Sequence, residues 1–217
     1  SDVAAWGTPL FTLDPAEPVQ SLAAEIAAAH DTPEARLMAA LRFVQDNVRY
    51  LALTYGEGSY VPASPASTLE TRYGDCKAKT ALLLELARAL EFEADPALVN
   101  LGAGRGIDHR EPSPGAFNHV IVRLNHNGET YWLDPTRSYQ GGTLDVVYQA
   151  DYGFALPLNG GDEGLVSMAP AAAPSASTVN IPETPDLSGG RAPPVVLLVH
   201  TVLPRHDAPP NPARHRL

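Results

Sequence analysis

The stretch Thr71–Leu90, TRYGDCKAKTALLLELARAL, carries the only cysteine of the chain, Cys76, at the start of a strongly periodic segment. Its apolar positions repeat at the spacing of one helix face, which predicts an amphipathic helix with a buried stripe. The stripe consists of Leu82, Leu83, Leu86 and Leu90. Asp75 precedes the periodic segment and is a suitable N-cap residue. Cys76 is therefore expected in the first turn of a helix.

Two interpretations of Cys76 follow from this position. The dipole and free N–H groups of a helix N-terminus favour an anion, and Lys77 and Lys79 add positive charge, which is expected to lower the pKa of the thiol. Gly74 allows a close backbone approach in the turn before the helix. Cysteine is, however, also among the residues most often buried as small hydrophobic groups. The stretch alone leaves both a nucleophile and a packing residue open.

A second feature is the dipeptide Asn127-Gly128 between two apolar runs, which predicts a β-hairpin. If the turn is centred one residue earlier, His119 lies directly opposite Asp134. If Asn127-Gly128 is itself a two-residue turn, Asp134 is the diagonal neighbour of His119. Both registers keep the two side chains on one face with Cβ atoms roughly 5 to 8 Å apart, whereas a three-residue turn would separate them. The expected strands are 117–124 and 129–134.

A helix-borne cysteine and a His–Asp pair together match the requirements of nucleophilic catalysis. In this interpretation His119 takes the thiol proton, Asp134 fixes the imidazole, and Cys76 attacks an acyl carbon. Backbone N–H groups at the helix start would stabilise the oxyanion. The same residue types can bind zinc, but no second cysteine, Cys-x-x-Cys or His-x-x-x-His accompanies them, which argues against a metal site.

At these residues the chain resembles the transglutaminase-like superfamily, in its bacterial branch. The matching motifs are Arg72–Lys77 (RYGDCK), Phe117–Val120 (FNHV) and Tyr131–Thr136 (YWLDPT), in the family's order and with spacings typical of its core. The resemblance extends from about residue 20 to residue 158. It implies an α+β, papain/transglutaminase-like core in which the helix carrying the Cys packs against an antiparallel sheet carrying His and Asp.

The resemblance also implies an activity. This is thiol-dependent acyl transfer or hydrolysis on peptide amides through a thioester, by a cysteine acyltransferase or a cysteine peptidase. Cys76 would be the nucleophile, His119 the base and Asp134 the orienting residue, with a peptide or protein as substrate. Bacterial relatives are often exported, so the resemblance implies the cell envelope or periplasm as the location. A non-catalytic peptide- or protein-binding module with a vestigial triad stays open as the alternative.

The chain departs from the family pattern at Ala78, and its sequence does not identify the side chain that completes the oxyanion site. Relatives commonly carry an acidic residue where this chain has Ala78, and its absence is expected to weaken a local ion pair or a substrate contact. In the family a side chain upstream of the cysteine completes the oxyanion site, and the candidates here are Tyr50, Tyr55 and Tyr60. The supporting residues expected on this side are Tyr55, Gly74 and Asp75. Nothing resembles the calcium sites of the animal enzymes, so neither a metal nor another cofactor is expected.

The net charge and the apolar and glycine patterns of the chain argue against several other classes of protein. The chain has 217 residues and a formal net charge of −10 without a basic run, which is a poor match to a nucleic-acid or anionic-membrane surface. Its longest apolar run, Val195–Val199, is too short to span a bilayer. Glycines at positions 102, 104 and 106 could be mistaken for a phosphate-binding loop, but prolines follow them where a helix would be needed.

Three parts are expected along the chain. Residues 1–18 form an irregular N-terminal segment, because prolines interrupt it. Residues 19–160 form the core, with a helix beginning at Val19 and another after Asp31, which is expected to cap it. Residues 161–217 form a proline-rich tail with a strand at 194–203. Such a strand needs a sheet edge to join, so the chain is predicted to lead into a further domain.

Overall fold

A computed structural model of the chain describes residues 2–52, 56–149, 151–160, 164–168, 179–180 and 200–201. The chain divides into two compact units, residues 1–171 and 172–217. In the second unit, the described residues form one antiparallel pair of strands, β8 (Val179–Asn180) and β9 (His200–Thr201). The strand expected at 194–203 overlaps β9, and its apolar part, 195–199, lies outside the described residues.

The first unit begins with helical structure where the sequence predicted an irregular segment. Helix α1 (Asp2–Gly7) and the 3-10 helix η1 (Thr8–Phe11) form there. Val3 and Phe11 are buried in the core, and Pro9 stands in the first turn of η1, where a missing N–H costs little. Burial against the rest of the unit therefore outweighs the prolines, and the prediction for residues 1–18 was wrong in this respect.

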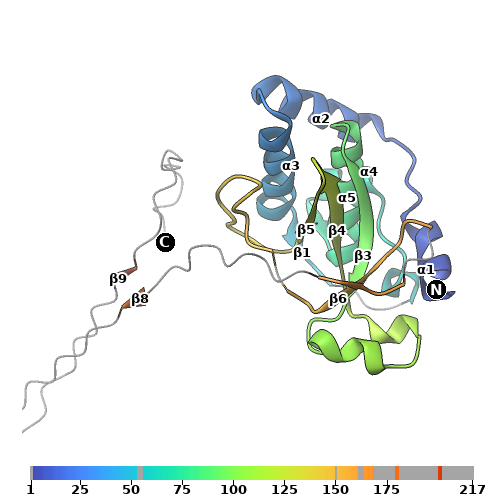
Figure 1. Ribbon diagram of the computed structural model, residues 1–217. Coiled ribbons are helices and arrows are strands. Elements are labelled where there is room, and N and C mark those ends of the chain that lie inside the picture. The colour runs from blue at the N-terminus through green and yellow to red at the C-terminus, as the bar shows by residue number, and fades with distance from the viewer. Residues whose placement is uncertain are drawn as a thin grey trace, which may run out of the picture. The chain divides into compact units, whose positions relative to one another are not determined.

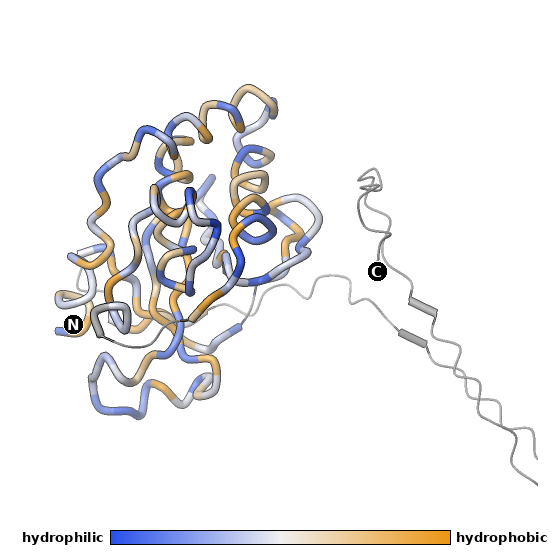
Figure 2. The backbone as a smooth tube through the Cα atoms, turned by 180° about the vertical axis from the view of Figure 1, so that it is seen from behind, coloured by the Kyte–Doolittle hydropathy of each residue, from blue (hydrophilic) through white to orange (hydrophobic). Residues whose placement is uncertain are grey.

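Two longer helices follow, α2 (Glu17–Ala29) and α3 (Pro33–Asn47). The cap of α3 differs from the prediction, since Thr32 and not Asp31 accepts the hydrogen bond from Ala35 N, at 3.2 Å. Proline at the first helical position places the N-cap one residue before it. Hydrophobic and hydrophilic residues alternate along these helices, as Figure 2 shows.

The segment after α3 leads to the cysteine. Strand β1 (Arg49–Tyr50), the 3-10 helix η2 (Gly56–Ser59), α4 (Pro65–Thr71) and β2 (Tyr73–Gly74) precede α5 (Cys76–Ala89). β1 and β2 pair in parallel, so Tyr50 lies beside Gly74. Asp75 caps α5 as predicted, accepting from Ala78 N at 3.0 Å. The parallel pair thus brings Tyr50 next to the start of the cysteine helix.

A five-stranded antiparallel sheet forms the other half of the core. Its order is β5-β4-β3-β6-β7. The strands are β3 (Glu93–Val99), β4 (His119–His126), β5 (Glu129–Leu133), β6 (Phe154–Pro157) and β7 (Val166–Ser167). Helix α5 packs against β3 and β4 and also contacts α2, α3 and α4 (Figure 1). The predicted α+β fold, a cysteine helix on an antiparallel sheet, is confirmed.

The hairpin adopts the second of the two predicted registers. Val122 pairs with Leu133 and His126 with Glu129, so Asn127 and Gly128 form a two-residue turn. Both have positive φ, at 52° and 81°, as a type I′ turn requires. Asp134 is then the diagonal neighbour of His119 on the same face.

Apolar side chains cover both faces of the sheet. One cluster joins the helices to the sheet and includes Leu82, Leu83, Leu86, Val120, Val122 and Leu124. A smaller cluster lies on the other face and comprises Ala97, Val99, Ile121, Trp132, Ala155 and Met168. Between β3 and β4, the expected loop contains two short 3-10 helices, η3 (Gly104–His109) and η4 (Pro114–Ala116). Among the described residues, no helix combines the length and the apolar character needed to cross a bilayer.

Candidate active site

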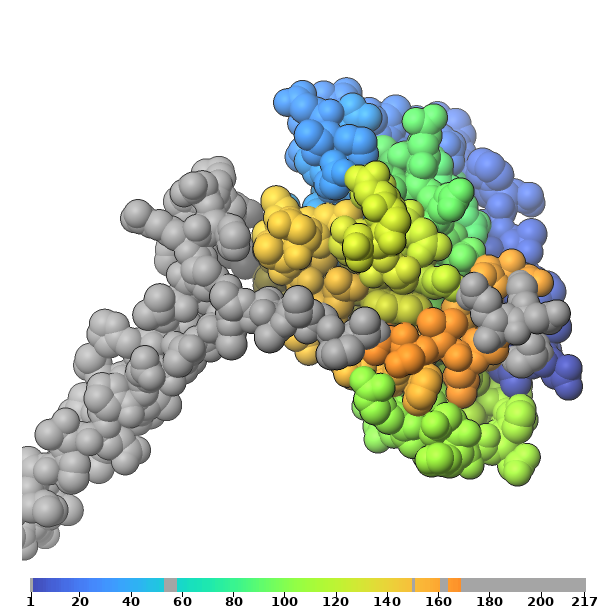
Figure 3. Space-filling view, viewed as in Figure 1, coloured from blue at the N-terminus to red at the C-terminus, as the bar shows by residue number. Residues whose placement is uncertain are grey.

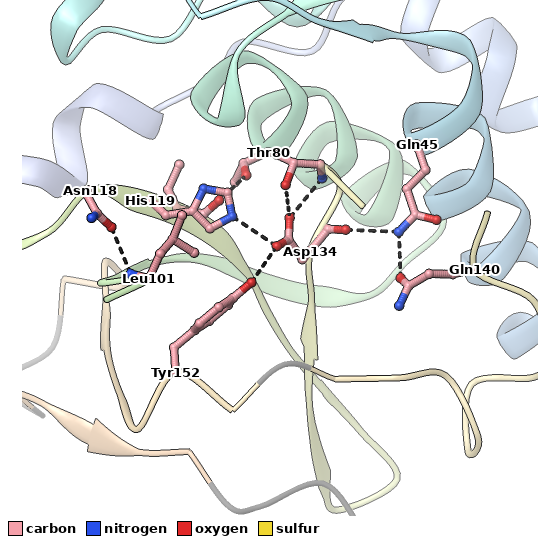
Figure 4. A network of polar contacts seen from close by, with 10 residues as sticks. Gln45, Thr80, Leu101, Asn118, His119, Asp134, Gln140 and Tyr152 are labelled. Atoms are coloured by element: carbon pink, nitrogen blue, oxygen red, sulfur yellow. Dashed lines mark hydrogen bonds and ion pairs between the residues drawn. The ribbon is translucent and has the colours of Figure 1, made fainter. Parts of the chain in front are cut away.

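Cys76 occupies the first position of α5 and is partly exposed. One turn later, the Thr80 hydroxyl donates to the Val120 carbonyl at 3.1 Å, which ties α5 to the strand that begins with His119 (Figure 4). Interactions with the side chain of Cys76 contribute to the pKa shifts of both His119 and Tyr50. The cysteine thus lies between an imidazole and a phenol.

His119 and Asp134 form a buried pair. His119 Nε2 lies 3.0 Å from Asp134 Oδ2, and the two residues are 7% and 6% exposed. Burial disfavours the imidazolium, but hydrogen bonds to Asp134 and Cys76, with the charges of both, raise the pKa of His119 to about 9. Burial likewise disfavours the carboxylate, yet the hydrogen bonds from His119 and Thr136 lower the pKa of Asp134 to about 2. Because Nε2 is bound to Asp134, the Nδ1 atom is left for Cys76.

Asp134 is held by further donors (Figure 4). Its Oδ1 accepts from the backbone N of Thr136 at 2.9 Å and from the hydroxyl of Thr136 at 2.6 Å. Its carbonyl accepts from Gln45 Nε2 at 3.0 Å, and the same nitrogen donates to Gln140 Oε1 at 2.7 Å. Helix α3 therefore holds the backbone of Asp134 at the end of β5.

Tyr152 also binds this carboxylate. Its hydroxyl donates to Asp134 Oδ2 at 2.9 Å, and its ring meets the His119 ring edge-on, with centroids 6.1 Å apart and an interplanar angle of 82°. Burial, together with the charge and the hydrogen bond of Asp134, raises the pKa of Tyr152 to about 12, against a smaller opposing effect of Arg137. Tyr152 therefore remains protonated and can act as a donor.

The three tyrosines considered as oxyanion donors have different places. Tyr50 lies against Cys76, and burial together with the negative charges of Cys76 and Asp75 raises its pKa, so its phenol stays protonated. The ring of Tyr60 packs against Trp6, with centroids 5.1 Å apart. Tyr55 lies outside the described residues. Of the three tyrosines, Tyr50 is thus the one that the described part of the chain places beside Cys76.

The turn before α5 is tight for steric reasons. A Cβ atom on Gly74 would lie 2.8 Å from Ala78 Cβ and 3.3 Å from Thr68 Cγ2. Ala78, where relatives commonly have an acidic residue, is 2% exposed and faces this turn. The carboxylate of Asp75 is paired with Lys77. An ion pair therefore exists beside the cysteine without an acid at position 78.

Cys76 and His119 line a cleft of about 310 Å³. Its lining is mainly apolar and comes from α1, η1, β1, the segment after η2, the start of α5 and the end of the β3–β4 connection. In the described part of the chain, no group of three or more His, Cys, Asp or Glu side chains is arranged to hold a metal ion.

Sequence reasoning did not identify Tyr152, Gln45 or Thr80 as parts of this network. Each lies outside the three quoted motifs, and each acts through a contact between segments distant in sequence. Asn118 was part of a quoted motif without an assigned role. Its Oδ1 accepts from Leu101 N at 2.9 Å and so closes the base of the β3–β4 connection.

Comparisons with solved structures show the fold. A candidate protease from Parabacteroides distasonis aligns with a TM-score of 0.57 and 12% identity, over 76% of this chain and 30% of that one. A candidate cysteine protease from Cytophaga hutchinsonii is 18% identical over 63% of this chain and 44% of that one, with a TM-score of 0.45. The chain thus spans less than half the length of either protein. The search among curated proteins returned no match.

The family model described as the transglutaminase-like superfamily matches residues 20–139, more than half of the chain. This range contains Cys76, His119 and Asp134 and ends before Tyr152. The helix-on-sheet architecture described above agrees with the match. The chain therefore belongs to the transglutaminase-like superfamily.

Proposed function

We propose that the chain is a thiol-dependent acyl-transfer enzyme that acts on peptide amides through a thioester at Cys76. The observation that carries this proposal is the placement of Cys76 between His119 and Tyr50 at a cleft, with His119 paired to a buried Asp134. A cysteine that only filled space would need neither the imidazole nor the phenol beside it.

The proposed chemistry follows from the positions of the donors. His119 takes the thiol proton of Cys76, and the imidazolium is stabilised by Asp134. The Cys76 sulfur forms a bond to the amide carbon while the carbonyl electron pair moves to oxygen. The backbone N–H of Cys76 and the phenol of Tyr50 donate to this oxyanion. His119 then gives its proton to the departing amine as the oxyanion collapses and the C–N bond breaks. Water or an amine attacks the thioester while His119 takes its proton, and the C–S bond breaks to release the acyl product and the Cys76 thiolate.

The experiment is the pH dependence of Cys76 alkylation by iodoacetamide. The chain has one cysteine, so the signal comes from one site. In the proposed site, alkylation continues at pH 5 to 6, where an ordinary thiol is almost fully protonated. His119→Ala is expected to reduce the rate there by at least about tenfold. His109→Ala is the matched control, because that side chain is 86% exposed and outside the cleft.

The outcomes separate the proposal from its alternative. If Cys76 behaves like free cysteine in both variants, or reacts only after unfolding, the binding module with a vestigial triad takes its place. If the thiol is activated, glutamine peptides with dansylcadaverine and with water alone distinguish transfer from hydrolysis. The envelope location expected from the resemblance remains a prediction, which cell fractionation would check.

A further inference from the structure

The cleft at Cys76 has a wall outside the part of the chain that matches the family model. Trp6 of α1 and Leu10 and Phe11 of η1 line it. Tyr60, which follows η2, also lines the cleft and meets Trp6 edge-on, with an interplanar angle of 85°. Trp6 is 41% exposed and Tyr60 is 51% exposed, so both rings keep apolar surface that an occupant can cover.

The charges in this lining are already paired. Among the described lining residues, the acidic carboxyl and the basic side chains are those of Asp75, Lys77 and His119. Asp75 pairs with Lys77, and His119 pairs with Asp134. A charged substrate side chain would therefore lose its hydration in the cleft without gaining a free counter-charge, which is unfavourable.

We propose that the cleft selects a peptide with a large, uncharged apolar side chain next to the carbonyl that Cys76 attacks, an inference that rests on the proposed function. The proposed amide chemistry makes the occupant a peptide, and Cys76 lines the same cavity as the apolar wall. The volume of about 310 Å³ lies at the lower end of ligand clefts, which are roughly 300–1,000 Å³. It suits one side chain and its adjoining backbone.

The test uses acetyl-aminoacyl chloromethyl ketones, in which the cysteine sulfur displaces chloride and forms a C–S bond. Rates for the Phe, Leu, Glu and Lys compounds are divided by their rates with glutathione. The Phe and Leu compounds are expected to react at least about tenfold faster than the Glu and Lys compounds. Trp6→Ala is expected to remove most of this preference. Tyr73→Ala is the matched control, since Tyr73 is 46% exposed and outside the lining.

A second readout does not depend on the chemistry of the thiol. The chain has two tryptophans, Trp6 and Trp132, so Cys76→Ala with Trp132→Phe leaves Trp6 as the fluorescent reporter. Titration with acetyl-phenylalanine amide is expected to give a saturable change, and acetyl-glutamate amide is expected to give none. Equal responses to both would overturn the apolar selection even where Cys76 is activated. Failure of the alkylation test with a retained fluorescence preference would overturn the proposed function and leave only the binding of apolar side chains in the cleft, without attack by Cys76.

An independent observation concerns the two oxygens of Asp134. Oδ1 accepts two hydrogen bonds from Thr136, and Oδ2 accepts one from His119 and one from Tyr152. Rotation of the carboxylate would therefore break bonds on both sides. We infer that Tyr152 is a positioning residue that keeps Asp134 aligned with His119.

Tyr152 is itself held in place by its neighbours. Gly153 has φ of +80°, and a Cβ atom there would lie 2.5 Å from backbone atoms of Gly104 and Arg105. The carboxylate of Asp151 accepts from Gly153 N at 2.8 Å and from Arg105 Nη2 at 3.4 Å. Figure 3 shows the segment that contains η3 beside β6 and β7. The segment between β3 and β4 thus fixes the backbone next to this tyrosine.

Tyr152→Phe removes the hydroxyl and keeps the ring. Two quantities are measured, the pH profile of iodoacetamide alkylation and the imidazole titration of His119 by NMR. The alkylation rate at pH 6 is expected to fall by about tenfold, because a misaligned imidazole is a poorer base for the thiol. The imidazole is expected to lose its proton below pH 9, because a carboxylate that can rotate no longer offsets burial. Tyr148→Phe is the control, since its ring stacks on the neighbouring Arg137, which also faces Tyr152.

The direction in which the imidazole titration of His119 shifts decides whether Tyr152 is a positioning residue. If Asp134 stayed aligned without the hydroxyl, loss of that donor dipole would leave the imidazole titration unchanged or move it to higher pH. Either result would overturn the positioning role. So would a lower free energy of unfolding in Tyr152→Phe with no change in the alkylation profile or the imidazole titration. Thr136→Val, which removes a donor from the other oxygen, is expected to shift the titration in the same direction as Tyr152→Phe.

Discussion

Lys79 Nζ donates to the carbonyl of Val48 at 2.7 Å, at the end of α3, although Lys79 is only 1% exposed. It also reaches the carbonyl of Gln45 at 3.4 Å. The sequence suggested that Lys79 adds positive charge next to Cys76, but the structure places its ammonium group at the C-terminal end of another helix. A cation is favourable there because of the helix dipole. Burial lowers the pKa of Lys79 to about 8, while Asp134 and Asp46 oppose the shift.

This pKa predicts a pH-dependent stability. The folded-state pKa lies below the reference value of 10.5, so between pH 8 and 10.5 the unfolded chain binds more protons at Lys79. The unfolding free energy of the wild type, relative to Lys79→Met, is therefore expected to rise over this window by up to about 3 kcal/mol. Urea denaturation at both pH values measures it, with Lys77→Met as control on the same helix. A difference that does not vary with pH would contradict the prediction.

Asp134→Asn is expected to lower the free energy of unfolding most in mildly acidic solution. The pKa of Asp134 is lowered from 3.8 to about 2, so its contribution is present above pH 3.8 and is lost as pH falls through 2. The pKa of His119 is raised from 6.5 to about 9, so its contribution is present below pH 6.5 and is lost as pH rises through 9. The destabilisation is expected to reach about 3 kcal/mol between pH 4 and 6.5 and to decrease toward pH 9. Thermal or urea unfolding across this range would refute it if the loss were greatest at pH 9.

Tyr50→Phe tests the oxyanion donor. The variant is expected to slow acylation by p-nitrophenyl acetate at least about tenfold, because one donor to the developing oxyanion is lost. Alkylation by iodoacetamide forms no oxyanion and is expected to change much less. Tyr73→Phe is the control, because Tyr73 is adjacent to Gly74 but outside the cleft lining. Equal losses of rate in acylation and alkylation would show that Tyr50 acts on the reactivity of the thiol and does not stabilise the oxyanion.

Gly74→Ala is expected to destabilise the fold by about 1–3 kcal/mol, since its methyl group would overlap Ala78 Cβ at 2.8 Å. Ala78→Gly removes the opposing methyl group at a cost of about 1 kcal/mol in the helix. The double variant is therefore expected to be more stable than the sum of the two single losses, and a double-mutant cycle by urea denaturation measures the coupling. If the losses of the two single variants simply add, the backbone around positions 74 and 78 relaxes enough to avoid the overlap.

Local signals account for the parts of the site that sequence reasoning anticipated. The Asp75 cap and the leucine stripe define the cysteine helix, and Asn127-Gly128 defines the hairpin register that places Asp134 near His119. Both depend on residues close together in the chain, and sequence patterns report such signals well.

The missed parts depend on packing between distant segments. Phe11 stabilises the N-terminal helices by burial, which a search for proline interruptions does not detect. Tyr152 and Gln45 reach Asp134 from 18 and 89 residues away in the chain, without a motif of their own. Thr32 and not Asp31 is the cap, because Pro33 occupies the first helical position and so places the N-cap at the residue before it.

The N-terminal wall of the cleft has a consequence for how this enzyme class diversifies. Cys76, His119 and Asp134, the proposed nucleophile, base and orienting acid, all lie within residues 20–139, whereas Trp6, Leu10 and Phe11 precede them. Under the two proposals, part of the apolar wall therefore lies in a segment that precedes the residues proposed to react. Exchange of residues 2–11 for the matching segment of a related protein is then a modular change, expected to alter which peptides the cleft accepts while Cys76, His119 and Asp134 stay in place.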